Sequence, residues 1–238
     1  MRTAYTVFRN LYNVRKMTMK LVLASGSQRR RELLTMCGYD YEIIVSNADE
    51  TIDENDPESF VRALSFRKAK EVFDRLFAAG RRDFAVIGSD TVVAFQKDGE
   101  TKPVIIGKPK DAKDAVRILS MLSGKTHRVF TGVSVIADIP DENAAAQCSI
   151  QEKAEIQTEC SITEVTFETL SPDEITDYVN SGDPLDKAGS YGIQGPFGMF
   201  VREIRGNYFT VIGMPIPVLY KMLKKIGILP HGFYERIE

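Results

Sequence analysis

The segment Leu21–Leu34 contains residue types that bind phosphate. An apolar run is followed by a Ser-Gly-Ser turn and then by Arg29, Arg30 and Arg31. Backbone N–H groups and the positive end of the dipole attract anions at a helix N-terminus, and guanidinium groups match pairs of phosphate oxygens. The pattern therefore predicts an anion site at a strand–turn–helix junction. The alternative is an ordinary helix with a solvated basic face.

Acidic residues in two further places could bind a divalent cation or activate water. Asp90 lies between two strand-like runs, in a position that predicts a loop at a strand end, where α/β folds carry reactive groups. Asp49 and Glu50 follow another predicted strand and could supply the further carboxylates of a magnesium site. The alternatives are a turn-stabilising role for Asp90 and solvated loop positions for the other two.

Two lysines and a glycine-dense stretch could complete such a site. Lys68 lies in an apolar helical stripe, so its ammonium needs either a route to solvent or an anionic partner such as phosphate. Lys108 lies on a Gly-Lys-Pro turn, where a surface role is equally plausible. Gln194, within Gly189–Gly195, could present its amide to the edge of a base, although an ordinary glycine loop is the alternative.

The composition excludes several kinds of partner and chemistry. The 31 basic and 33 acidic residues nearly cancel, so no net field favours a nucleic-acid polymer or a membrane surface. The three cysteines lie far apart and the chain has two histidines, His127 and His231, which argues against a Cys/His zinc site and a Ser-His-Asp triad. No apolar run has the length of a membrane span. We expect a soluble protein that binds a small anion through carboxylates, lysines and arginines.

The periodicity predicts one α/β domain, which begins near residue 20. Strands are expected at Lys20–Ser25, Tyr41–Ser46, Phe84–Gly88, Thr91–Phe95, Val104–Ile106, His127–Ala137, Ser161–Phe167 and Phe200–Ile204. Helices are expected at Gln28–Cys37, Pro57–Ala79, Asp111–Leu122, Pro172–Asn180 and Ile216–Ile226. The two longest β-like runs, one on each side of residues 138–159, are expected to pair as an antiparallel ribbon.

Two segments fall outside this pattern. Residues 1–19 are basic and contain no acidic residue, as in a mitochondrial targeting segment; a short packed or disordered extension is the alternative. Residues 138–159 are polar and without a clear period, and are expected to form a surface excursion.

The order of the motifs resembles that of the Maf family of nucleoside triphosphate pyrophosphatases. The resemblance runs from about Lys20 to Ile226. The matching motifs are Leu23-Ala-Ser-Gly-Ser27 with Arg29-Arg30, Asp49-Glu50-Thr51, Lys68-Ala69, Ser89-Asp-Thr91, Gly107-Lys-Pro109, Leu122-Ser-Gly-Lys-Thr-His127, Ser181-Gly-Asp-Pro184, Asp186-Lys-Ala-Gly189 and Tyr191-Gly-Ile-Gln-Gly195. The resemblance implies a mixed α/β fold related to that of inosine triphosphatases, with two lobes around a deep cleft, and commonly a homodimer.

The resemblance also implies a reaction and assigns residues to it. A nucleoside triphosphate would be hydrolysed to the monophosphate and pyrophosphate, with Asp90 as the proton acceptor that activates water. Asp49 and Glu50 would join Asp90 in holding a divalent cation, Mg²⁺ or Mn²⁺. The residues that would hold the triphosphate are Ser25, Arg29, Arg30, Lys68 and Lys108.

A base preference is implied as well. Arg29, Thr91 and Gln194 match positions associated with substrate choice, and an arginine with a threonine at the first two resembles the branch acting on dTTP and UTP, with modified pyrimidine nucleotides as further candidates. Gln28 departs from the family's usual proline, and Asn47-Ala48 replaces a more acidic approach to the metal residues. The alternatives are an inosine or xanthosine triphosphate pyrophosphatase and a non-catalytic nucleotide-binding regulator of cell division. A cytoplasmic location is expected, with mitochondria as the alternative.

Overall fold

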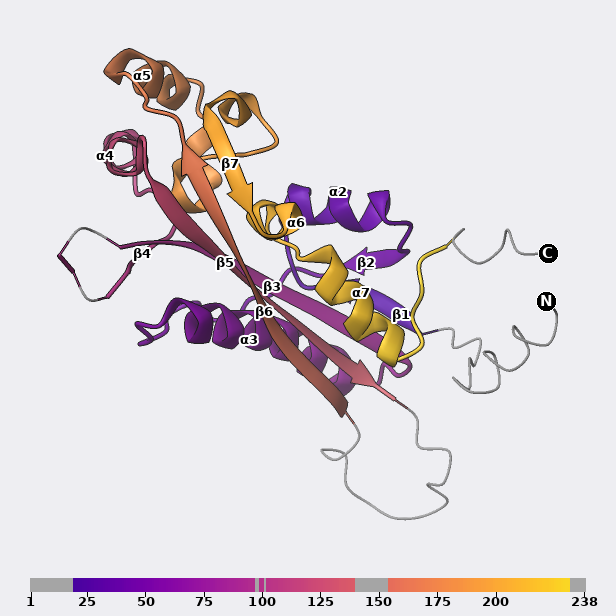
Figure 1. Cartoon of the computed structure of the whole chain (residues 1–238). Helices are drawn as coiled ribbons and strands as arrows, with labels where there is room; N and C mark the ends of the chain where they lie inside the picture. Colours follow the sequence, from indigo (N-terminus) through magenta and orange to yellow (C-terminus); the bar gives the residue numbers. More distant parts are fainter. Residues whose placement is uncertain (1–18, 97–98, 101, 140–153, 232–238) are drawn as a thin grey trace, which may run out of the picture.

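A computed structural model describes residues 19–96, 99–100, 102–139 and 154–231. Here the strands form one mixed seven-stranded sheet in the order β2-β1-β3-β5-β6-β7, with β4 paired to β3 (Figure 1). The strands are β1 (Lys20–Leu23), β2 (Tyr41–Ile43), β3 (Phe84–Phe95), β4 (Val104–Ile106), β5 (Thr126–Asp138), β6 (Ala154–Phe167) and β7 (Val201–Arg205). The α-helices are α2 (Gln28–Met36), α3 (Pro57–Ala78), α4 (Ala112–Leu122), α5 (Pro172–Asn180), α6 (Tyr208–Ile212) and α7 (Ile216–Lys225). The mixed α/β fold expected from the sequence is confirmed.

The long strands β3, β5 and β6 are antiparallel and form the centre of the sheet. β1 is parallel to both of its neighbours, β2 and β3. The register of β5 and β6 runs from Thr126 opposite Thr166 to Asp138 opposite Ala154, which confirms the predicted ribbon. Residues 154–159, expected in a surface excursion, belong to β6 instead. Their side chains are only partly buried or exposed, so the segment lacks the apolar alternation that signals a strand.

β3 is one continuous strand, and the loop predicted around Asp90 is wrong. Gly88 and Ser89 suggested a break, but Gly88 is required where α3 packs against the sheet. A Cβ at Gly88 would lie 2.2 Å from the carbonyl oxygen of Ser65, and a Cβ at Gly132, which pairs with Asp90, would lie 2.2 Å from that of Val61. The two glycines therefore let α3 lie directly against the middle of β3 and β5.

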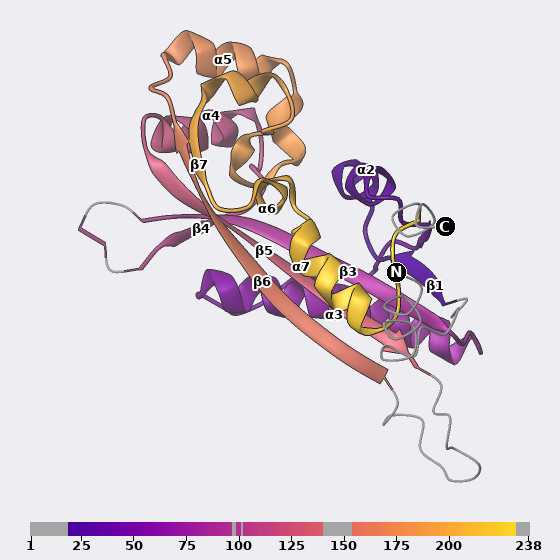
Figure 2. The ribbon, with the colours of Figure 1, turned by 45° about the vertical axis from the view of Figure 1, so that its right-hand side comes forward.

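Alternating residues of β3 pack against helices on opposite faces of the sheet. Phe84 and Val86 belong to an apolar cluster with α3, whereas Ala85 and Ile87 belong to a cluster with α2 and α7. Figure 2 shows α3 and α7 on the two sides of the long strands. Asp90 has the same alternation as the α3-facing residues, so its side chain is directed towards α3.

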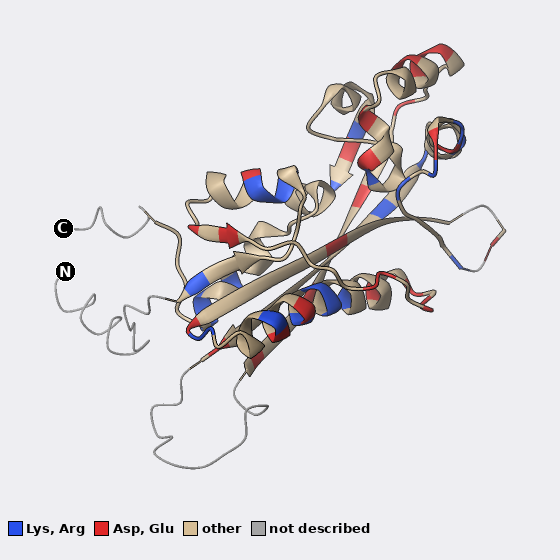
Figure 3. Cartoon of the chain, turned by 180° about the vertical axis from the view of Figure 1, so that it is seen from behind, with Lys and Arg blue, Asp and Glu red and all other residues tan. Residues whose placement is uncertain are grey.

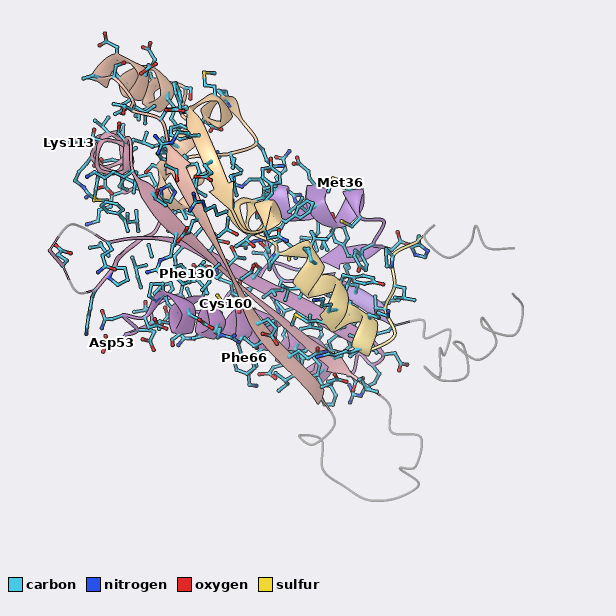
Figure 4. All side chains as sticks on the ribbon, viewed as in Figure 1. Met36, Asp53, Phe66, Lys113, Phe130 and Cys160 are labelled. Atoms are coloured by element: carbon cyan, nitrogen blue, oxygen red, sulfur yellow. The ribbon has the colours of Figure 1, made fainter. Side chains whose placement is uncertain are left out.

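Separate apolar cores lie at the two ends of the long strands. One core joins β1, α2, α7 and the end of β5. The other joins β4, α4, α5 and the starts of β5 and β7. A smaller cluster beneath α3 contains Phe130, with Cys160 packed against it (Figure 4). The two groups of elements meet at the middle of β3, where Asp90 is located.

Some short elements were not predicted from the sequence. The glycine-dense stretch contains three short 3-10 helices, η1 (Asp183–Asp186), η2 (Ala188–Ser190) and η3 (Pro196–Phe200). α6 was not predicted because it has only five residues. The predictions for residues 1–18 and 140–153 lie outside the described residues. No helix in the described part of the chain is both long and apolar enough to span a bilayer.

Candidate active site

Lys68 lies between two carboxylates at the centre of the candidate site. Its Nζ is 2.7 Å from Oδ1 of Asp90 and 3.0 Å from Oε1 of Glu50. The side chains of Lys68 and Asp90 are each 12% exposed, and that of Glu50 is 64% exposed. Of the two alternatives for Lys68, a route to solvent or an anionic partner, the structure has the second, with carboxylates from two other segments as the partners. One positive and two negative charges meet here beside the middle of the sheet.

The start of α3 and the acidic loop before it bring Glu50 to Lys68. Asp56 caps the helix by accepting the Ser59 N–H at 2.9 Å, and Pro57 occupies its first turn. Arg67 then donates to the carbonyl oxygens of Asp49 and Thr51, both at 2.8 Å. This bidentate clamp fixes the loop against α3, one helical position from Lys68.

Asp49 does not join these carboxylates. Its Oδ1 accepts the Thr51 N–H at 2.9 Å, and this hydrogen bond lowers the pKa of the Asp49 carboxyl group. Figure 3 shows acidic and basic residues mixed along α3, and acidic residues in the loop that precedes it. In the described residues, no group of three or more His, Cys, Asp and Glu side chains is placed to hold a metal ion. The metal set Asp49, Glu50 and Asp90 stays a prediction.

The turn between β1 and α2 is held by the buried guanidinium group of Arg30. It donates from Nε to the Gly213 carbonyl at 2.8 Å, from Nη1 to Ser25 Oγ at 3.1 Å and from Nη2 to Thr91 Oγ1 at 3.3 Å. Burial lowers the pKa of Arg30, and the neighbouring Asp90 charge opposes this effect. Ser27 begins α2 without a side-chain cap, so the first N–H groups of the helix are left for another acceptor.

Thr91 is part of the same hydrogen-bonded framework. Its Oγ1 lies 3.0 Å from Oγ1 of Thr131, which donates to the Thr210 carbonyl at 2.7 Å. Because a hydroxyl has one hydrogen, Thr91 donates to Thr131 and accepts from Arg30. Thr91 therefore orients Arg30 in this structure.

A family model described as Maf-like protein matches residues 20–226. The chain belongs to the Maf family. A protein of Agathobacter rectalis named dTTP/UTP pyrophosphatase is 39% identical over 217 residues, which cover 88% of this chain and 98% of that protein. Proteins of the same name from Bacillus thuringiensis subsp. konkukian and Bacillus anthracis are each 42% identical over 210 residues, covering 88% of this chain and 96% of theirs. The structure of the Staphylococcus aureus Ham1 protein has a TM-score of 0.45 at 14% identity, covering 86% of this chain and 98% of that one.

Three further residues, Arg29, Lys108 and Gln194, were carried over from the Maf motifs. Arg29 Nη1 is 3.3 Å from Oδ2 of Asp186, in η1. Lys108 and Gln194 both have exposed side chains. The N–H of Gly189 donates to the Gly107 carbonyl at 3.0 Å, which fixes the Gly-Lys-Pro turn beside the glycine-dense stretch.

The structure thus gathers Ser25, Arg30 and Thr91 into one framework, and joins Lys68 to Asp90. Sequence reasoning missed two members of the site. Arg67 was not singled out, because nothing in its sequence context signals that it clamps the acidic loop. The Gly213 carbonyl accepts both from Arg30 and, at 2.9 Å, from Ser89 Oγ, but a backbone acceptor leaves no signal in residue type.

Proposed function

We propose that this Maf-family protein hydrolyses dTTP and UTP to the nucleoside monophosphate and pyrophosphate, and is thus a hydrolase acting on acid anhydrides. The names of the relatives support this reaction. The observation that carries the proposal is the Asp90–Lys68 pair, which is largely buried. Asp90 directly precedes Thr91, a member of the framework that supports an uncapped helix N-terminus. Such a site offers a base and cationic groups to a polyphosphate.

Asp90 would accept the proton of the attacking water. The carboxylate lies on a central strand and is fixed by the ammonium group of Lys68, so its position does not depend on a mobile loop. The Lys68 charge would shift towards the phosphates when a triphosphate binds, which leaves Asp90 free to act as a base. Arg30, held by three acceptors, would keep the β1–α2 turn in the shape that receives the phosphate oxygens.

The donor set also fits a divalent cation. Mg²⁺ is commonly bound by one or two carboxylates together with substrate phosphates, and Asp90 and Glu50 both approach the position of one cationic group, Lys68 Nζ. These two residues would hold Mg²⁺ or Mn²⁺, and Asp49 would join them only after release from Thr51. The ion would supply charge neutralisation for the phosphates and the pyrophosphate leaving group.

Arg29 and Gln194 would select the base. The pyrimidine edge of thymine or uracil presents an acceptor, a donor and an acceptor, which match the donors of Arg29 and the amide of Gln194. Guanine presents a second donor in place of the last acceptor. A site built from these groups leaves polar atoms unpaired when the wrong base enters, which costs several kcal/mol. The homodimer and the cytoplasmic or mitochondrial location stay predictions.

The test is a panel of canonical, methylated and deaminated nucleoside triphosphates, assayed for pyrophosphate and for the monophosphate with and without Mg²⁺ or Mn²⁺. We expect dTTP and UTP to have the highest kcat/KM, and no turnover in a chelator. Preference for a purine triphosphate would overturn the assignment of the base, and absence of pyrophosphate from every nucleotide would overturn the reaction.

A further inference from the structure

The side chain of Asp186 joins two cationic groups. One carboxylate oxygen lies 3.3 Å from Arg29 Nη1 and the other lies 2.7 Å from Lys187 Nζ. Lys187 is 12% exposed, Arg29 is 31% exposed and Asp186 is 67% exposed. The contact connects α2 with η1, two elements that are far apart in the sequence; α2 belongs to one apolar core, and α5, the helix that precedes η1, belongs to the other.

From Lys187 the contacts continue into the glycine-dense stretch. Lys187 Nζ lies 3.0 Å from Oδ1 of Asp183, and Oδ2 of Asp183 accepts the hydroxyl hydrogen of Tyr178 at 2.5 Å. Tyr178 in turn accepts the N–H of Gly192 at 3.1 Å. A Cβ at Gly192 would lie 2.6 Å from Cε of Lys187, so the backbone there lies directly against the lysine. A chain of polar contacts thus leads from Arg29 to a backbone position two residues before Gln194.

The charges of this network cancel. Arg29 and Lys187 carry two positive formal charges, and Asp183 and Asp186 carry two negative ones. A divalent cation would balance the charges of Asp90 and Glu50. The charge of Asp186 is balanced instead by the side chains of Arg29 and Lys187. Its negative charge therefore remains when the metal and the triphosphate bind. A polyanion gains little from approaching Arg29, whereas the remaining N–H donors of Arg29 can still serve an uncharged acceptor.

We propose that Asp186 is a positioning residue that determines specificity: it reserves Arg29 for the base by orienting its guanidinium group and cancelling the charge that would otherwise attract phosphate. The inference rests on the proposed function and deepens it. The contacts of Lys187, Asp183 and Tyr178 fix the position of the Arg29 guanidinium group relative to the loop that carries Gln194. Base selection is then a property of this network, with Arg29 as its contact group.

The experiment compares the wild type with Asp186→Asn, Asp186→Glu and the matched control Asp177→Asn, an exposed aspartate of α5. It measures kcat/KM for dTTP and GTP, and the affinity for inorganic pyrophosphate by titration calorimetry at one magnesium concentration. We expect Asp186→Asn to lower the dTTP:GTP ratio about five- to tenfold and to bind pyrophosphate several-fold more tightly. Asp186→Glu, which keeps the charge, should retain the weak pyrophosphate binding, and Asp177→Asn should match the wild type.

A double variant tests whether Asp186 acts through Arg29. In an Arg29→Ala background, Asp186→Asn should change neither the ratio nor the pyrophosphate affinity further. The inference requires that the wild type hydrolyses dTTP. It is overturned if Asp186→Asn changes neither the dTTP:GTP ratio nor the pyrophosphate affinity. It is also overturned if Asp186→Asn changes them by the same factor in the Arg29→Ala background as in the wild type. Failure of the wild type to release pyrophosphate from any nucleotide overturns the proposed function instead, and base selection by Asp186 with it.

Discussion

Acidification should destabilise the protein through a single buried histidine, His127. The ring lies inside the β4–α4–α5 core, with Nε2 3.0 Å from the hydroxyl oxygen of Tyr191 and its centroid 4.7 Å from that of Phe167. Burial lowers the pKa of His127 from 6.5 to about 3. The folded protein therefore holds a neutral imidazole throughout the pH range in which the unfolded chain takes up a proton.

The sign and size of the effect follow from this difference. Because the pKa of His127 is lower in the folded protein than in the unfolded chain, the free energy of unfolding has its full value above pH 6.5. It decreases as the pH falls from 6.5 towards 3. The value pH 5 is about 1.5 units below the pKa of the histidine in the unfolded chain. This difference corresponds to a loss of about 2 kcal/mol in the free energy of unfolding. This figure is the same for any folded pKa below about 4, because the folded ring is neutral at pH 5 in every such case.

The assay is urea unfolding at pH 7 and pH 5 of the wild type, His127→Phe and the control His231→Gln. The phenylalanine variant loses the Tyr191 hydrogen bond and should be less stable than the wild type by about 1–3 kcal/mol at pH 7, a deficit that shrinks at pH 5. Its stability should nevertheless change between the two pH values by about 2 kcal/mol less than that of the wild type. His231, exposed beside Asp40, serves as the control for replacement of a histidine at the surface. Equal pH dependence in the wild type and His127→Phe would refute the reasoning.

Three further substitutions, and a fourth as a control, test the site and its support. Asp90→Asn should keep the fold and lower kcat at least about a hundredfold, and a variant with more than a tenth of the wild-type rate at saturating metal would exclude Asp90 as the base. Lys68→Ala should slow all nucleotides by the same factor, since it acts on phosphates common to every substrate, so a change in base preference would contradict its role. Gly132→Ala should lower the free energy of unfolding by about 3 kcal/mol or more, because its Cβ would meet the Val61 carbonyl, whereas Gly107→Ala, with open space around it, should stay within about 0.5 kcal/mol in the same denaturation assay.

Elements with strong local signals were predicted from the sequence. α3 begins at Pro57 after an Asp cap, and α5 begins at Pro172 after a Ser171–Glu174 capping box, so both starts are set by neighbouring residues. The β5–β6 ribbon was also visible because β5 is a long run of β-branched residues. Such features depend little on the rest of the fold.

Features that depend on distant contacts were missed. Gly88 reads locally as a strand break, but its lack of a side chain is needed where α3 crosses β3. The need of Lys68 for a partner was apparent, whereas the identity of that partner depends on the approach of α3 to Asp90. Likewise, the presence of Glu50 beside Lys68 depends on the Arg67 clamp, which no local pattern indicates. The sequence therefore predicted the candidate residues better than it predicted their contacts.

The central claim is that water attacks the α-phosphorus of a pyrimidine nucleoside triphosphate at Asp90. Its most direct test is hydrolysis of dTTP in water enriched in ¹⁸O, with mass analysis of both products for the wild type and Asp90→Asn. We predict dTMP and pyrophosphate in equal amounts, with one ¹⁸O atom in dTMP and none in pyrophosphate, and almost no product from the variant. Formation of dTDP and labelled phosphate, or label in pyrophosphate, would contradict the account.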